Sequence, residues 1–144
     1  MKYTRILFIG ILAALSSAVF AGLVQPAPVT ITVSPDDSST SVSGDMITAR
    51  FSDNDVENIG CGTRVIENEF GGFQFGFCQA IDSDETSVFC STQNADLLEA
   101  MKAVSAYSFI TFSFDNVSGE CTRIGFSSQS LYIPNKVHNG KKKK

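Results

Sequence analysis

The sequence contains no tryptophan, and its only histidine, His138, lies close to the C-terminus. A Ser-His-Asp hydrolase would therefore have no general base in the body of the chain. The lack of tryptophan removes the commonest stacking platform for sugars and leaves Tyr107 and Tyr132 for that role. No Gly-Lys-Ser or Gly-Lys-Thr follows the glycines near residue 72, so no phosphate-binding loop is indicated. We assign no catalytic and no cofactor-binding residue.

Basic residues are scarce between residues 22 and 135, a segment that holds all 15 Asp and Glu residues. Its basic residues are Arg50, Arg64, Lys102 and Arg123. An acidic body of this kind repels nucleic acid, so we expect no DNA or RNA partner. Lysines are concentrated instead at the C-terminus, and residues 136–144 are predicted to be a disordered basic tail.

Long apolar runs are confined to the N-terminus. Lys2 and Arg5 precede the run "ILFIGILAALSSAVF", and the small residues of "VFA" suit cleavage after Ala21. This pattern predicts a signal peptide at 1–21. No later segment approaches the roughly 20 apolar residues of a spanning helix, so we expect no membrane span after cleavage. The mature protein is expected to be secreted or periplasmic.

The four cysteines, Cys61, Cys78, Cys90 and Cys121, contain no Cys-x-x-Cys pair. Structural zinc sites use closely spaced ligand pairs, so we assign no metal-binding residue. An even number of cysteines in an exported chain indicates disulfides instead. The sequence therefore predicts two disulfide bonds, for which three connectivities exist.

The N-terminal part of the mature chain is polar and short of core residues. Residues 22–45 are predicted to be an N-terminal strand, "VTITVS", followed by a polar loop, "PDDSSTSVSGD". A single α+β domain is predicted for residues 46–135, beginning with a strand at "MITARFS".

Alternating and helical patterns define the rest of that domain. Phe73, Phe75 and Phe77 alternate strictly and are predicted to share the core face of a strand, and residues 110, 112 and 114 repeat this pattern. Between them, "NADLLEAMKAVSAY" has helical spacing with Asn94 as N-cap. The fold class is therefore predicted to be α+β: an antiparallel sheet of about five to seven strands with one helix, about 94–107, packed on one face.

Strand registers place the cysteines relative to this core. Hairpins centred on Asp84 and between residues 69 and 70 put Cys78 opposite both Cys90 and Cys61. Under these registers all four cysteines lie on the polar face, away from the phenylalanines. We favour Cys78–Cys90 with Cys61–Cys121. The alternative is Cys61–Cys78 with Cys90–Cys121.

A family resemblance rests on the segments "GCGTRVIE", "FGFCQAIDSD", "VFCSTQNADLL", "AYSFITFSFDNVSGECTRIGF" and "SLYIP". Together they resemble small exported four-cysteine proteins of bacteria over about residues 58–134. That group is functionally uncharacterised. The resemblance therefore implies export and a single domain, and no activity.

Two clusters of acidic residues are candidates for calcium binding. "DNDVEN" carries Asp53, Asp55 and Glu57 at alternate positions, but the sixth and twelfth positions of a calcium loop are occupied by Asn58 and Arg64. A second cluster lies in "DSDE" at 82–85. We interpret both clusters as solvated loop acids.

Three functions are consistent with these observations. The first is a non-enzymatic module that binds an unidentified protein or cell-surface partner. The second is an inhibitor of a secreted hydrolase, with "PDDSSTSVSGD" as its binding loop. The third is a small hydrolase that uses two carboxylates. We favour the first, because no catalytic constellation is present in the sequence.

Overall fold

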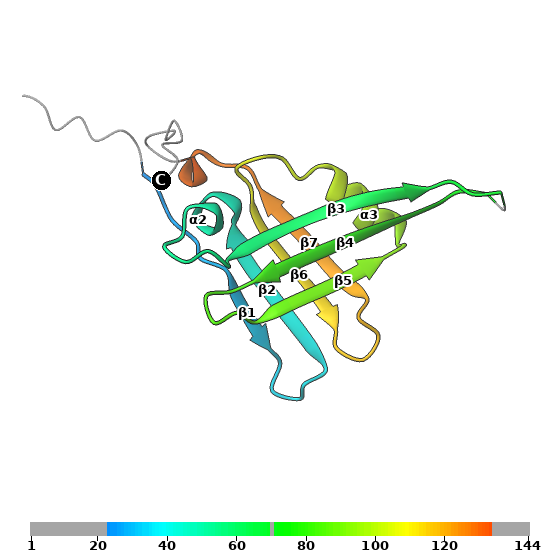
Figure 1. Ribbon diagram of the computed structural model, residues 1–144, viewed down its shortest axis with the longest axis horizontal. Helices are drawn as coiled ribbons and strands as arrows, with labels where there is room; N and C mark the ends of the chain where they lie inside the picture. Colours follow the sequence, from blue (N-terminus) through cyan, green and yellow to red (C-terminus); the bar gives the residue numbers. More distant parts are fainter. Residues whose placement is uncertain (1–22, 70, 134–144) are drawn as a thin grey trace, which may run out of the picture.

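A computed structural model describes residues 23–69 and 71–133 of the chain. Seven strands form two antiparallel sheets, one lying in front of the other with strands that run in different directions (Figure 1). The four-stranded sheet has the order β1 (Thr30–Val33), β2 (Ser39–Asp45), β6 (Phe109–Asp115) and β7 (Cys121–Ser127). The three-stranded sheet has the order β3 (Asn58–Ile66), β4 (Phe73–Ile81) and β5 (Ser87–Thr92).

The helical elements are α2 (Met46–Arg50), α3 (Ala95–Lys102) and the short 3-10 helix η1 (Ser130–Tyr132). The predicted fold class, a mostly antiparallel α+β fold with a helix and two disulfides, is confirmed. The predicted signal peptide, 1–21, and the basic tail from 136 onward lie outside the described residues.

The core lies between the two sheets. Val42, Ile110 and Phe112 of the four-stranded sheet are fully or almost fully buried, as predicted for the row at 110–114. They belong to one apolar cluster with Cys78 and Ala80 of the three-stranded sheet. Burial of these side chains is the main favourable contribution to folding.

The orientation of the three-stranded sheet is the reverse of the prediction. Cys78 is completely buried, whereas Phe73 on the opposite face of β4 is 45% exposed. The inner face needs small residues: a Cβ on Gly76 would clash with the sulfur of Met101 and would lie 3.0 Å from Leu98 Cδ2. Because α3 packs this closely against β4, a row of phenylalanine rings would not fit inside.

The hairpin registers within this sheet are as predicted. Cys61 lies opposite Cys78, and Cys78 lies opposite Cys90. The register of β7 differs, because Ile124 pairs with Phe112 and not with Ile110. A pairing irregularity beside Phe114 brings Cys121 opposite that residue. As a result, Cys121 is directed into the core.

The favoured disulfide pairing is wrong, and the alternative is present: Cys61–Cys78 and Cys90–Cys121. The sequence could not reveal how close β5 and β7 come to each other. A single parallel bridge pairs Ser91 with Glu120, and Ser91 N–H donates to the carbonyl of Gly119 at 3.2 Å. This contact places Cys121 beside Cys90, so the second disulfide joins the two sheets.

Two predictions for the N-terminal part also need correction. β1 lies within the predicted first strand, but most of the predicted polar loop is β2, a central strand paired with β6. "MITARFS" begins with the helix α2 and is not a strand. Asp45 initiates this helix, because its side chain accepts hydrogen bonds from Ile47 N (2.9 Å) and Thr48 N (2.7 Å).

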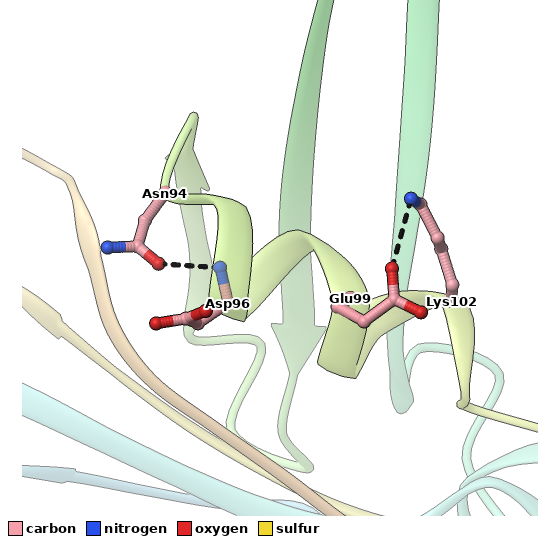
Figure 2. Close-up of polar contacts among 4 residues, drawn as sticks. All are labelled: Asn94, Asp96, Glu99 and Lys102. Carbon is pink, nitrogen blue, oxygen red and sulfur yellow. Dashed lines mark hydrogen bonds and ion pairs between the residues drawn. The ribbon is translucent and has the colours of Figure 1, made fainter.

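Helix α3 starts where the sequence places it. Asn94 Oδ1 accepts hydrogen bonds from Asp96 N (3.0 Å) and Leu97 N (3.2 Å), which makes Asn94 the N-cap; Figure 2 shows the first of these bonds. An ion pair between Glu99 and Lys102 lies on its exposed side at 3.2 Å (Figure 2). The helix ends at Lys102, earlier than predicted. Tyr107 has a φ of 66°, which lies outside the range of a right-handed α-helix.

Candidate functional site

Four phenylalanines form a continuous row on the outer surface of the three-stranded sheet. We call this row, Phe73, Phe75 and Phe77 of β4 with Phe89 of β5, the aromatic face. Neighbouring ring centroids are 6.1, 6.3 and 6.0 Å apart along the row. Phe89 is 56% exposed, and Phe73 is nearly as exposed. Contiguous exposed apolar patches of this kind mark interaction sites on soluble proteins.

The neighbouring strand β3 is adapted to the aromatic face. The ring of Phe77 lies over Gly62, where an added Cβ would be 3.1 Å from Phe77 Cζ. Arg64 Cζ lies 4.8 Å from the centroid of the Phe77 ring, which is a cation–π contact. Glycine at position 62 therefore lets the ring lie against the sheet while Arg64 covers it.

An open groove runs beside the aromatic face and has a volume of about 580 Å³. Its apolar wall is formed by Phe73, Phe75 and Phe89. The remaining lining is polar: Ser91, Thr92, Gln93, Ser118 and Glu120. The groove therefore combines an aromatic wall with polar side chains that can bond a ligand, as binding sites do.

The surroundings of the groove are acidic. Glu120 lines it, and Glu67 and Glu69 are exposed on the hairpin between β3 and β4. Residues 22–135 include 15 acidic residues and four basic ones. The aromatic face therefore lies in a field that attracts cations and repels anions.

A second depression, of about 540 Å³, lies beside α2. Its lining includes Arg50, Asp55, Glu57 and Tyr107 together with apolar side chains such as Ile47. Glu57 has a structural role there: Oε1 accepts from Val29 N at 3.1 Å, and Oε2 accepts from Asn54 Nδ2 at 2.7 Å. Both oxygens are thus used to fix the loop that precedes β3.

The first candidate calcium cluster is therefore not assembled as a ligand set. Asp53 and Asp55 are exposed, and Glu57 is engaged as described. Within residues 23–69 and 71–133, the groups that could hold a metal do not include these carboxylates.

The second acidic cluster stabilises a turn. Asp82 Oδ1 accepts hydrogen bonds from Asp84 N (3.0 Å) and Thr86 N (2.9 Å), while Glu85 adopts a positive φ of 63°. An aspartate that bonds the backbone two residues onward is typical of a tight turn. The carboxylate of Asp82 thus closes the hairpin between β4 and β5.

Two other aspartates hold exposed turns and have lowered pKa values. Hydrogen bonds from the hydroxyls of Ser34 and Ser38, and from Ser38 N, lower the pKa of Asp36 to about 2. The backbone N–H and hydroxyl of Ser118 lower the pKa of Asp115. Asp36 lies in the turn between β1 and β2, at the start of the predicted inhibitor loop, and most of that predicted loop is the strand β2.

The sulfur atoms form one cluster inside the core. Cys78, Cys90 and Cys121 have Sγ atoms within 4.8 Å of one another, and all three side chains are buried. Each cysteine belongs to one of the two disulfides, so the cluster has no free thiol among the described residues. The two disulfides are consistent with an oxidising location outside the cytoplasm.

A comparison with protein-family models, curated proteins and solved structures finds no significant match. Among the described residues, no helix is both long and apolar enough to cross a membrane.

The aromatic face was missed from the sequence because alternation shows which residues share a face, not which face is buried. One signal could have found it. Cysteine is among the most frequently buried residue types, and in β4 Cys78 alternates with the phenylalanines beside Gly76 and Ala80. Small apolar residues and a cysteine on one face indicate close packing there, which leaves the rings outside.

Proposed function

We propose that the protein is an exported, non-enzymatic binding module that binds a protein partner through its aromatic face. The observation that carries this proposal is the row of four neighbouring phenylalanine rings, two of which are about half exposed. Full burial of an exposed phenylalanine contributes about 1.5–3 kcal/mol, and the half-exposed rings of Phe73 and Phe89 forgo about half of this. A partner that covers them recovers part of this free energy.

Export is supported by the four cysteines and the N-terminal sequence. Disulfides are common in oxidising compartments and rare in the reducing cytosol, so the two disulfides support an exported protein. The mature chain is expected to begin at Gly22, secreted or in the periplasm. N-terminal sequencing of protein from the extracytoplasmic fraction tests this expectation, and recovery of a chain that retains Met1 in the membrane would reject it.

A binding role is better supported than either alternative. The inhibitor loop proposed at 35–45 consists largely of strand β2, which is paired with β1 on one side and β6 on the other, so it offers little unpaired backbone to a protease. A two-carboxylate hydrolase would need its carboxylates in one site. Asp55 and Glu57 both line the depression beside α2, but the two carboxylate oxygens of Glu57 already accept hydrogen bonds from Val29 N and Asn54 Nδ2. Glu120 lies apart from them, in the lining of the aromatic groove.

The test compares the two outer faces of the molecule. The double variant Phe73→Thr/Phe89→Thr removes the most exposed rings, and the control Ser41→Ala/Thr111→Ala alters the opposite sheet. Immobilised proteins are incubated with cell-envelope extract and culture fluid, and captured proteins are purified and measured for affinity. We expect a protein that binds the wild type and the control and loses at least about tenfold affinity for the phenylalanine variant. Equal affinity for all three would contradict the proposal.

A further inference from the structure

We infer that the segment bound by the aromatic face is an extended basic polypeptide with Lys or Arg at alternate positions. This inference rests on the proposed function, because it names the chemistry of the partner at that same face. It is carried by an intramolecular contact, a spacing and the distribution of charge.

The intramolecular contact is that of Arg64 with Phe77. The guanidinium carbon lies 4.8 Å from the ring centroid, and Nη1 also donates to the carbonyl of Thr63 at 3.2 Å. The chain itself therefore places a cation on one ring of the row. Among the described residues, Arg64 on Phe77 is the only cation–π contact of the aromatic face. The rings of Phe73, Phe75 and Phe89 offer the same chemistry to an external cation.

The spacing of the rings matches an extended peptide. Along β4 the ring centroids are 6.1 and 6.3 Å apart. An extended strand rises about 3.4 Å per residue, so its alternate side chains are about 6.8 Å apart and point to the same side. A strand running along β4 can thus present one cation to Phe73 and the next to Phe75, the two rings of β4 that Arg64 does not cover, and its other side chains face away.

The charge of the protein selects the sign of the partner. Glu120 lines the groove next to the rings, and Glu67 and Glu69 lie on the hairpin from which β4 starts. Carboxylates at the rim attract Lys and Arg and accept their hydrogen bonds. A second copy of this chain would bring its own excess of acidic residues to the interface, and that repulsion disfavours self-association through this face.

The experiment uses two synthetic peptides of equal composition. One alternates arginine and serine over eight residues, and the other has four arginines followed by four serines. Their dissociation constants for the full mature protein are measured by fluorescence anisotropy at low salt. The alternating peptide places twice as many cations on one side, so we expect it to bind at least about 3-fold more tightly, with the difference reduced by salt.

Two variants identify the surface that is used. Phe73→Leu keeps an apolar side chain but removes the π face, and it should weaken the alternating peptide by about 2- to 5-fold. Ser41→Ala on the opposite sheet is the matched control and should leave the affinity unchanged. Circular dichroism is used to check that both variants are folded.

Equal affinity for the two peptides, or an alternating peptide that is insensitive to Phe73→Leu, would overturn the inference. Its failure is distinguishable from failure of the proposed function. If capture of a cellular partner still depends on the phenylalanines, the face binds a protein of different chemistry. The protein could also bind a second copy of itself more tightly than it binds the peptide. Concentration-dependent dimerisation that is lost in Phe73→Leu would show this, would assign the face to self-association and would also overturn the inference.

Discussion

The two outer faces of this molecule are built from opposite kinds of side chain. The three-stranded sheet exposes the aromatic face, whereas the four-stranded sheet exposes hydroxyl groups from Thr30, Ser41, Ser43 and Thr111. Ser41 Oγ and Ser113 Oγ are 3.0 Å apart, so neighbouring strands satisfy each other's hydroxyls. This difference between the two outer faces is the basis of the proposal that the aromatic face binds a partner.

The inner faces, in contrast, resemble each other. Each sheet contributes one cysteine to the disulfide that joins them: Cys90 comes from β5 and Cys121 from β7. Both side chains are buried. Small residues and sulfur therefore stabilise the interior, and the large rings of β4 lie on the surface, where we propose that they bind a partner. The proposal thus implies a separation of roles between the buried and the exposed phenylalanines.

The largest expected effect concerns the two populations of phenylalanine. Phe112 is 0% exposed, and Phe112→Ala should lower the free energy of unfolding by about 3–5 kcal/mol because it leaves a cavity in the core. Phe89→Ala, the matched substitution on the aromatic face, should cost less than about 1 kcal/mol. Urea unfolding measures both, and equal losses would contradict the separation of roles.

The second effect concerns the disulfide between the sheets. Replacing Cys90 and Cys121 by alanine opens a loop of 31 residues and should cost about 4 kcal/mol in the chain-entropy model. Replacing Cys61 and Cys78 opens a loop of 17 residues and should cost about 3 kcal/mol.

Calorimetry of the two double variants checks the order of these losses. A larger loss for Cys61 and Cys78 would mean that the disulfide inside one sheet, and not the one between sheets, dominates stability. Non-reducing proteolysis of the wild type, with cleavage both between residues 62 and 77 and between residues 79 and 89, tests the pairing itself: the Cys61 peptide must remain joined to the Cys78 peptide until reductant is added, and neither must be joined to the Cys90 peptide.

Features that depend on local interactions could be predicted from the sequence, and features that depend on contacts distant in the sequence could not. The turn at Asp84 and the N-cap at Asn94 were correct, because each depends on side chains that bond the nearby backbone. Helix α2 was missed although Asp45 caps it by the same mechanism. The preceding serine-rich segment resembles a linker, and this obscured both β2 and the cap.

The orientation of the three-stranded sheet depends on contacts that are distant in sequence. Gly76 must accommodate Met101 of α3, and Cys90 must reach Cys121 of β7. Neither requirement can be read from the alternation within β4, which is equally compatible with either face inward. The candidate site was missed because its residues were assigned to the core, although Gly76, Cys78 and Ala80 on the other face of β4 were a signal against that assignment.

A smaller effect tests the packing that keeps the rings outside. Gly76→Ala should lower the free energy of unfolding by about 1–3 kcal/mol, because the new Cβ would clash with Met101. Gly60→Ala is the control on the other face of the sheet, where nothing lies within 4 Å of an added Cβ. Thermal unfolding should show a loss for the first variant and little change or a gain for the second.

The smallest expected effect on stability concerns Asp36, in the turn between β1 and β2 of the four-stranded sheet. The pKa of Asp36 is lowered from 3.8 to about 2 in the folded protein, so its ionised form stabilises the fold. That contribution is complete above the unfolded-state pKa and is lost as the pH falls through about 2. The difference in melting temperature between the wild type and Asp36→Asn should therefore be largest above pH 4 and shrink toward pH 2. A difference that grows on acidification would contradict this sign.

The most direct test of the central claim, that the three-stranded sheet directs its rings outward and its cysteines inward, is hydroxyl-radical footprinting read by mass spectrometry. Phe73 and Phe89 are 45% and 56% exposed, whereas Phe112 is 0% exposed. The structure predicts rapid oxidation of Phe73 and Phe89 in the native protein, with Phe112 protected until the protein unfolds. Protection of Phe73 and Phe89 to the same degree as Phe112 would show that the sheet faces the other way, and the proposed binding surface would not exist.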